Sequence, residues 1–289
     1  MFRIVAICLS VSLGLAAWGC GRSRPQQVWI DPALLSMTPT DTVAMVGIRL
    51  EKVRTSPLYK TLTAEGEIFR AREFQERTGI DPERDLWEVL ITSNGSESMA
   101  FARGRFSPHG REPQPGGDGV GRLAYKGYTL LGDEDSAVVF LNASTAVAGR
   151  TRTLRNLIDQ RGANTLGPSR ELSELLRDVP GESDLWAVSL GPAFLDQLAI
   201  PERGNAANLR RMFGSVESAM LGVDLAKGVD VAVKATYRGE ADAGQAADAL
   251  NLLATLGRWD LPAPIEREGR VLSLRMGLPE TLVRKLAGQ

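Results

Sequence analysis

The sequence contains few side chains whose type and spacing suit catalysis or metal binding. His109 is the single histidine, and it lies between Pro108 and Gly110, where we expect no packing to hold it. A catalytic histidine needs neighbours that fix its orientation, so we interpret His109 as a surface residue. The cysteines, Cys8 and Cys20, are too few to complete a zinc site with one histidine.

Other chemical patterns are incomplete. Residues 116–121 are glycine-rich but lack the spacing and the following Lys-Ser/Thr of a phosphate-binding loop. The acidic residues 133–135 are adjacent, whereas a calcium loop alternates its ligands, and the start of a helix explains the alternating acids of residues 81–85. We therefore expect no catalytic, cofactor-binding or metal-binding residue, no cofactor and no enzymatic activity. A hydrolase site assembled from distant residues is the least favoured alternative.

The N-terminus carries the most specific pattern in the chain. Arg3 precedes an uncharged apolar run over residues 4–18. This run is shorter than the roughly 20 residues that a membrane-spanning helix needs, and it is typical of the hydrophobic part of a signal peptide. Gly19 and Cys20 end the run, and a polar segment follows at once.

This leader resembles the lipobox of bacterial lipoproteins, in which a small residue precedes the lipid-bearing cysteine. The resemblance implies a signal peptide over residues 1–19 and a lipid on Cys20, the first residue of the mature chain. Ala17 and Trp18 stand where the family prefers leucine and a small residue. Since Ala17, Trp18 and Gly19 also fit an ordinary cleavage site, a plain secreted protein or an uncleaved anchor is the alternative.

The same resemblance implies a location in the cell envelope. Proteobacterial lipoproteins retained at the inner membrane carry aspartate after the cysteine, whereas this chain has Gly21. The resemblance thus favours the outer membrane, facing the periplasm, over the inner membrane. Beyond the leader, the body resembles only uncharacterised bacterial lipoproteins, and that likeness assigns no functional residue.

Composition indicates a globular protein without a nucleic-acid-binding charge. The 289 residues are 43% hydrophobic and 24% charged, with a formal net charge of -1, so no basic excess is available to hold nucleic acid. Arg150, Arg152 and Arg155 form a small basic cluster, which suits anionic lipid head groups or, as the favoured interpretation, the solvated side of a helix. Removal of the leader also removes Cys8, so no internal disulfide is expected.

Turn signals divide the body. We expect a lipid-attached tether over residues 20–32 and two units over residues 33–167 and 168–289. Residues 107–122 hold three prolines and five glycines without apolar periodicity, which predicts a disordered-like loop. The first unit is expected to contain strands at residues 42–50, 86–92, 97–106, 125–132 and 137–141.

The second unit gives the clearest pattern. Residues 218–225 and 229–237 alternate in polarity around Lys227 and Gly228, which predicts an antiparallel hairpin with Leu221, Val223, Val231 and Val233 on its buried face. Helices are expected near residues 245–256 and from Pro279. Both units have a similar order of strands, helices and hairpins, so we predict an α+β fold of antiparallel sheets with helices on one face, possibly two similar tandem units.

These observations favour a non-enzymatic binding or scaffolding module anchored at a membrane. Without a convergent polar cluster, its binding surface would be a sheet edge or a face between the units. A periplasmic carrier of an apolar ligand is the second interpretation, and an apolar cavity would favour it. We therefore expect a membrane partner through the lipid, a protein partner or an apolar ligand, and no nucleic acid.

Overall fold

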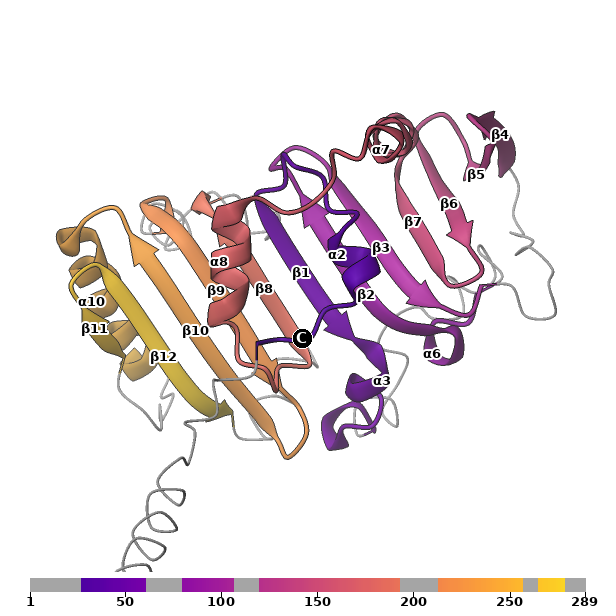
Figure 1. The fold of residues 1–289 in the computed structure, drawn as a ribbon. Helices are drawn as coiled ribbons and strands as arrows, with labels where there is room; N and C mark the ends of the chain where they lie inside the picture. Colours follow the sequence, from indigo (N-terminus) through magenta and orange to yellow (C-terminus); the bar gives the residue numbers. More distant parts are fainter. Residues whose placement is uncertain (1–26, 61–79, 107–119, 193–212, 257–264, 279–289) are drawn as a thin grey trace, which may run out of the picture.

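The chain folds around one continuous antiparallel sheet of twelve strands (Figure 1). A computed structural model describes residues 27–60, 80–106, 120–192, 213–256 and 265–278. The strand order across the sheet is β11-β12-β10-β9-β8-β1-β2-β3-β7-β6-β5-β4. This arrangement confirms the α+β class predicted from the sequence.

The strands fall into two groups along the chain. The first group is β1 (Ala44–Arg49), β2 (Leu86–Ser93), β3 (Ser98–Gly104), β4 (Gly121–Tyr125), β5 (Tyr128–Gly132), β6 (Ser136–Asn142) and β7 (Thr145–Arg150). The second group is β8 (Leu185–Leu190), β9 (Val216–Asp224), β10 (Val229–Tyr237), β11 (Glu266–Glu268) and β12 (Val271–Leu278).

Helices of very different length connect and cover these strands. The described helices are α2 (Pro32–Leu35), α3 (Leu50–Val53), α6 (Pro82–Asp85), α7 (Thr151–Ala163), α8 (Arg170–Asp178) and α10 (Glu240–Leu256). Ser169 caps α8 by accepting a hydrogen bond from the backbone N–H of Leu172 at 3.2 Å, as its position in the sequence predicts.

The same strand order occurs twice in the sheet. From the centre outward, one group runs β1-β2-β3-β7-β6 and the other runs β8-β9-β10-β12-β11. Strands β4 and β5 extend the first group at its outer end. The two groups meet edge to edge, because β1 pairs antiparallel with β8, with Val46 opposite Ala187. This order supports the hypothesis of two similar units, although they share one sheet.

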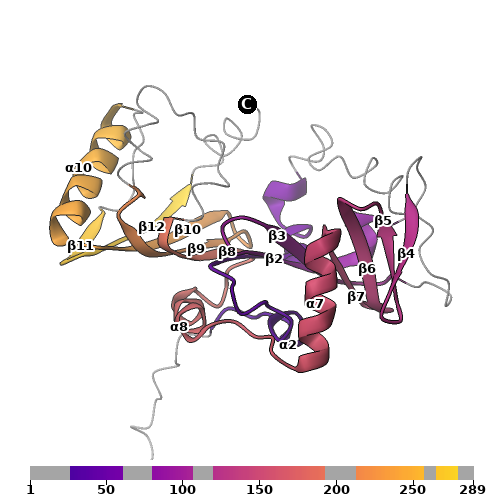
Figure 2. The same cartoon turned by 90° about the horizontal axis from the view of Figure 1, so that it is seen from above.

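One face of the sheet, here called the N-terminal face, carries the largest core. The segment 27–37, α2, α7 and α8 lie on this face (Figure 2). Leu34, Leu154 and Leu172 from these elements are completely buried, and they belong to one cluster with Trp186 and Phe101 of the sheet. Burial of such side chains is worth about 2 kcal/mol each.

The other face, here called the opposite face, carries α3 against β1 and β2 in the middle of the sheet and α10 against β10, β12 and β11 toward one edge (Figure 2). Ala243 and Ala246 of α10 pack against Tyr237 and Leu272, while Leu50 of α3 packs near Phe106. The helices thus lie on both faces, where the sequence pattern had predicted one. Both faces need cover because the strands carry apolar side chains on each side.

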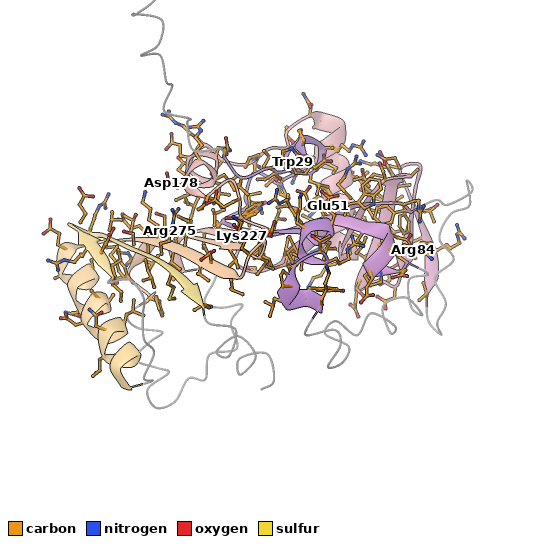
Figure 3. The ribbon with its side chains drawn as sticks, turned by 90° about the horizontal axis from the view of Figure 1, so that it is seen from below. Trp29, Glu51, Arg84, Asp178, Lys227 and Arg275 are labelled. Atoms are coloured by element: carbon orange, nitrogen blue, oxygen red, sulfur yellow. The ribbon has the colours of Figure 1, made fainter. Side chains whose placement is uncertain are left out.

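The packed part of the chain begins earlier than the predicted tether allows. Val28 and Ile30 are only 4% and 8% exposed, so residues 27–32 belong to the folded body. Trp29, between them, points outward and is 53% exposed (Figure 3). Alternation of buried and exposed side chains over these residues is the signature of an extended segment lying on a core.

The predicted strand over residues 125–132 is two strands. Lys126 and Gly127 have positive φ angles of 46° and 84°, which is the geometry of a two-residue hairpin turn. They connect β4 to β5. Strand β4 begins at Gly121 and so occupies the end of the predicted loop 107–122, whose residues 107–119 lie outside the described part of the chain.

The predicted hairpin of β9 and β10 is present, but the buried side is not the predicted one. Met220 and Ala232 are 8% and 9% exposed and face the N-terminal face. Leu221, which was expected to be buried, is 37% exposed. The reason is tertiary: α8 packs against β9 on one face, whereas α10 reaches only the end of the hairpin near Ala235 on the other.

Candidate functional site

Four charged side chains of alternating sign cross the centre of the N-terminal face. Arg103 on β3 lies opposite Glu88 on β2, which lies opposite Arg49 on β1. Arg49 donates to Asp184, just before β8, at 2.9 Å. We call these four residues the charge row. The ion pair of Arg49 with Asp184 joins the two strand groups where β1 meets β8.

Glu88 is the most unusual member of the charge row. It is 5% exposed, and its Oε1 accepts a hydrogen bond from the backbone N–H of Asp31 at 3.1 Å. Its Oε2 is buried without a hydrogen-bond partner among the described residues. Burial raises the pKa of Glu88 to about 7, against the opposing effect of the Asp31 hydrogen bond, because a low-dielectric environment penalises the carboxylate.

Asp31 connects the charge row to the N-terminal segment. Its carboxylate accepts from the backbone N–H of Ala33 at 2.7 Å, which caps α2, and from Arg103 Nε at 2.8 Å. Arg103 also donates to the hydroxyls of Ser144 and Thr145, at 2.8 and 2.6 Å. The N-terminal segment is therefore fastened to the sheet by hydrogen bonds as well as by apolar packing.

The chemistry of the charge row is structural. A buried carboxyl group with a raised pKa is a candidate general base or acid when it reaches a cleft. Glu88 instead lies beneath the segment that contains Asp31, and it lines none of the three grooves formed by described residues near the row and at the ends of the sheet. The charge row thus holds the N-terminal segment in place.

The opposite face carries a different surface on the same central strands. Two rows of apolar side chains run across β2, β1, β8, β9, β10 and β12 in register. We call these twelve residues the central apolar strip: Ile91, Val46, Ala187, Leu221, Val233 and Leu274 in one row, and Val89, Ile48, Leu185, Val223, Val231 and Met276 in the other.

The central apolar strip is incompletely buried. None of its members is fully buried and Leu221 is exposed, whereas Met45, Leu90, Trp186 and Val188 on the reverse side of the same strands are at most 2% exposed. The described helices reach only the ends of the strip, with α3 against β1 and β2 and α10 against β10 and β12. A contiguous, partly exposed apolar patch of this kind is a candidate interaction surface.

Two arginines of the predicted basic cluster, Arg152 and Arg155, form ion pairs. Arg152 pairs with Glu97 at 2.7 Å and Arg155 with Glu134 at 3.4 Å. The guanidinium of Arg155 also lies 5.8 Å from the centre of the Tyr125 ring. These contacts compensate the charges of Arg152 and Arg155, whereas Arg150, the N-cap residue of α7, is exposed.

The acidic patterns have local explanations. Asp133 Oδ1 accepts from the backbone N–H groups of Asp135 and Ser136 at 2.8 Å each, which forms the turn before β6 and lowers the pKa of Asp133. Asp81 caps α6 by accepting from the N–H of Glu83 at 3.0 Å. Asp85 is buried, and its hydrogen bond from Arg84 lowers its pKa.

The remaining predicted residues lie outside the described part of the chain: Cys20, His109, the glycines at 116, 117 and 119, and the helix expected from Pro279. Among the described residues, no group of three His, Cys, Asp or Glu side chains is placed to hold a metal ion. Within the same residues, no helix has the length and apolar character needed to cross a bilayer.

Sequence reasoning missed both the charge row and the central apolar strip. The charge row draws on three strands and on Asp184, which precedes β8, and no local spacing links Glu88 to Asp31. The strip was visible as alternation in β9 and β10, but the sequence does not say which face of a sheet the helices will cover.

No protein-family model matches the chain, and no curated protein was found that matches it. Solved structures of TP0453 are similar in fold. Crystal form III aligns with 14% identity and a TM-score of 0.54, covering 90% of this chain and 99% of that chain. Crystal form IV aligns with 12% identity and a TM-score of 0.53, covering 90% and 98%. The fold is thus shared over nearly the whole length.

Proposed function

We propose that this chain is an exported, lipid-anchored protein of the bacterial cell envelope that acts as a non-enzymatic binding or scaffolding module. The central apolar strip is its binding surface. The leader that ends at Gly19 and Cys20 supports the anchor, with the outer membrane, facing the periplasm, as the favoured location. The strip supports the binding role, because its apolar residues are less buried than those on the reverse side of the same strands.

The position of the N-terminal segment on the sheet supports the proposed membrane anchor. Residues 27–37 pack on the N-terminal face. The short polar stretch between Cys20 and Gln27 is therefore the proposed linker between the folded body and the bilayer. About 3.3 Å per extended residue limits their separation. The strip lies on the reverse side of the sheet from residues 27–37.

A carrier of an apolar ligand is the second candidate function. The strip would then form one wall of the ligand site, since ligand sites are lined mainly by apolar side chains. The same observation therefore favours both candidates, and the occupant of the strip distinguishes them: a protein partner for the scaffold and a small apolar molecule for the carrier.

Site-specific photo-crosslinking in cells tests the proposal. A benzophenone side chain replaces Leu221 in the strip, and a matched variant carries it at Leu252, which is 58% exposed on α10 outside the strip. A protein-sized adduct from position 221 alone supports the scaffold, and a small-molecule adduct from that position alone supports the carrier. No adduct at 221, or equal adducts at both positions, would contradict a binding role for the strip.

A further inference from the structure

A groove on the N-terminal face lies on the reverse side of the sheet from the central apolar strip and borders the charge row through Thr145, which accepts a hydrogen bond from Arg103. It is enclosed by α2, the turn between β6 and β7 and the C-terminal end of α7, and we call it the α2–α7 groove. Both helices lie on the same side of the sheet (Figure 2). Its volume is about 340 Å³, at the lower end of the range for small-molecule sites.

The α2–α7 groove is lined by both apolar and polar side chains, and the polar ones include Ser36 and Thr145. Met37, Leu141 and Leu166 contribute the apolar lining, and Met37 is only 8% exposed. Arg161, Asn142 and Asn164 contribute polar groups. Apolar walls with a few placed polar groups are the usual composition of a ligand site, in which the polar groups set the orientation of the ligand.

Among the described residues, no carboxylate forms an ion pair with Arg161. Within the same part of the chain, the guanidinium of Arg161 donates one hydrogen bond, to the neutral hydroxyl of Tyr128 at 3.3 Å. Two other arginines of α7, Arg152 and Arg155, each pair with a glutamate. None of the residues that line the groove is acidic, so the guanidinium is the one formal charge there.

The asparagine side chains add hydrogen-bond donors. Asn142 Oδ1 already accepts from the backbone N–H and the hydroxyl of Ser144, at 2.9 and 3.1 Å. Its amide NH2 group therefore stays available as a donor. Asn164, which also lines the groove, ends α7 in the left-handed region with a φ of 54°. The groove thus combines one cation with amide donors.

Two other grooves formed by described residues have a different composition. A second groove, near β10 and β12, is lined by Glu182, Asp224 and Asp230 together with Arg275. A third, at the start of β1, contains Asp41 and Glu97. Excess positive charge and donors are therefore not a general property of grooves in this molecule.

We propose that the α2–α7 groove binds a small ligand that joins a carboxylate to an apolar body, such as an acylated amino acid with an apolar side chain. The guanidinium of Arg161 matches a carboxylate with two parallel hydrogen bonds. Asn142 and Asn164 donate to the amide oxygen, and Met37, Leu141 and Leu166 contact the apolar side chain. This site is independent of the proposed function, because it uses other residues on the other face.

Three matched probes test the proposal on the mature chain: N-acetyl-leucine, N-acetyl-leucinamide and N-acetylglycine. The amide removes only the carboxylate, and the glycine compound removes only the apolar side chain. We expect N-acetyl-leucine to bind in calorimetric titration and each of the others to bind at least about ten-fold more weakly, as the loss of a charge-assisted hydrogen bond or of buried apolar area predicts.

Two variants locate the binding. Arg161→Gln should weaken N-acetyl-leucine at least about ten-fold and leave N-acetyl-leucinamide unchanged. Arg177→Gln, at an exposed position on α8, removes the same charge elsewhere and should change neither. The proposal is overturned if N-acetyl-leucine shows no binding, if its amide binds equally, or if Arg161→Gln has no larger effect than Arg177→Gln.

Discussion

Glu88 places a carboxyl group where ionisation is unfavourable. Its side chain is 5% exposed and one of its oxygens has no partner among the described residues. The charged groups that surround it come from several elements: Arg49 on β1, Glu51 on α3, Arg103 on β3 and Asp31 before α2. Its pKa of about 7 instead of 4.5 means that the folded state holds a proton which the unfolded chain releases.

The raised pKa sets the sign of a pH dependence. Between about pH 4.5 and 7 the folded state binds more protons at this residue than the unfolded state, so the free energy of unfolding falls as pH rises. A difference of this size corresponds to about 3 kcal/mol. Glu88→Gln removes the ionisation and keeps the shape, so it should raise stability at pH 8 relative to wild type and flatten the loss between pH 5 and 8.

Urea unfolding of wild type and Glu88→Gln at pH 5, 6, 7 and 8 checks this expectation. The matched control is Glu217→Gln, since Glu217 is a surface residue that pairs with Arg270. If Glu88→Gln is less stable than wild type at every pH and keeps the same slope, Glu88 is ionised in the folded protein and its environment has been misjudged.

At the level of elements, a short turn motif predicted a hairpin only where the residues on both sides of it alternate in polarity. Lys227 and Gly228 were recognised as a hairpin turn because strict alternation surrounds them. The same dipeptide, Lys126 and Gly127, forms the turn between β4 and β5. The predicted strand over residues 125–132 runs through this turn, and most of β4 lies before that strand. Pairing with β5 rather than local propensity makes residues 121–125 a strand.

The junction between β1 and β8 depends on the absence of a side chain. Gly47 lies opposite Trp186, and a Cβ atom at position 47 would lie 2.1 Å from the indole ring. Trp186 is 2% exposed, so its ring has little room to move. The two strand groups can therefore pack at this point only around a glycine.

Gly47→Ala should lower the free energy of unfolding by at least about 1–3 kcal/mol, the usual cost of forcing extra atoms into a packed core. Denaturant unfolding measures the change. Gly228→Ala is the control, because a Cβ at that turn meets no atom within 4 Å, and it should change stability by less than about 0.5 kcal/mol. Equal stability of Gly47→Ala and wild type would show that the indole does not pack over position 47.

For the whole molecule, the sequence supported the α+β class and the order of strands, helices and hairpins in the two units. It left open how the units meet, since edge-to-edge and face-to-face packing were both compatible with that order. The structure shows one sheet across both units through β1 and β8. The way in which the two units meet depends on long-range pairing between residues such as Val46 and Ala187, which no local sequence pattern encodes.

The joined sheet also explains the central apolar strip. The strip crosses six strands from both groups, so it exists only when the two units share a sheet. Four of its residues, Leu221, Val223, Val231 and Val233, were expected on a buried face, whereas the described helices cover the reverse side of the sheet more completely. The candidate binding surface is thus a property of the assembled molecule and was not visible in either half of the sequence.

The proposed function rests first on the lipid anchor at Cys20. Metabolic labelling of cells with a fatty acid, followed by fractionation, tests this most directly in wild type, Cys20→Ala and Cys8→Ala. We expect label and membrane association in wild type and in Cys8→Ala, because Cys8 leaves with the signal peptide, and neither in Cys20→Ala. An unlabelled wild-type protein, or label that persists in Cys20→Ala, would contradict the proposal of a lipid-anchored envelope protein.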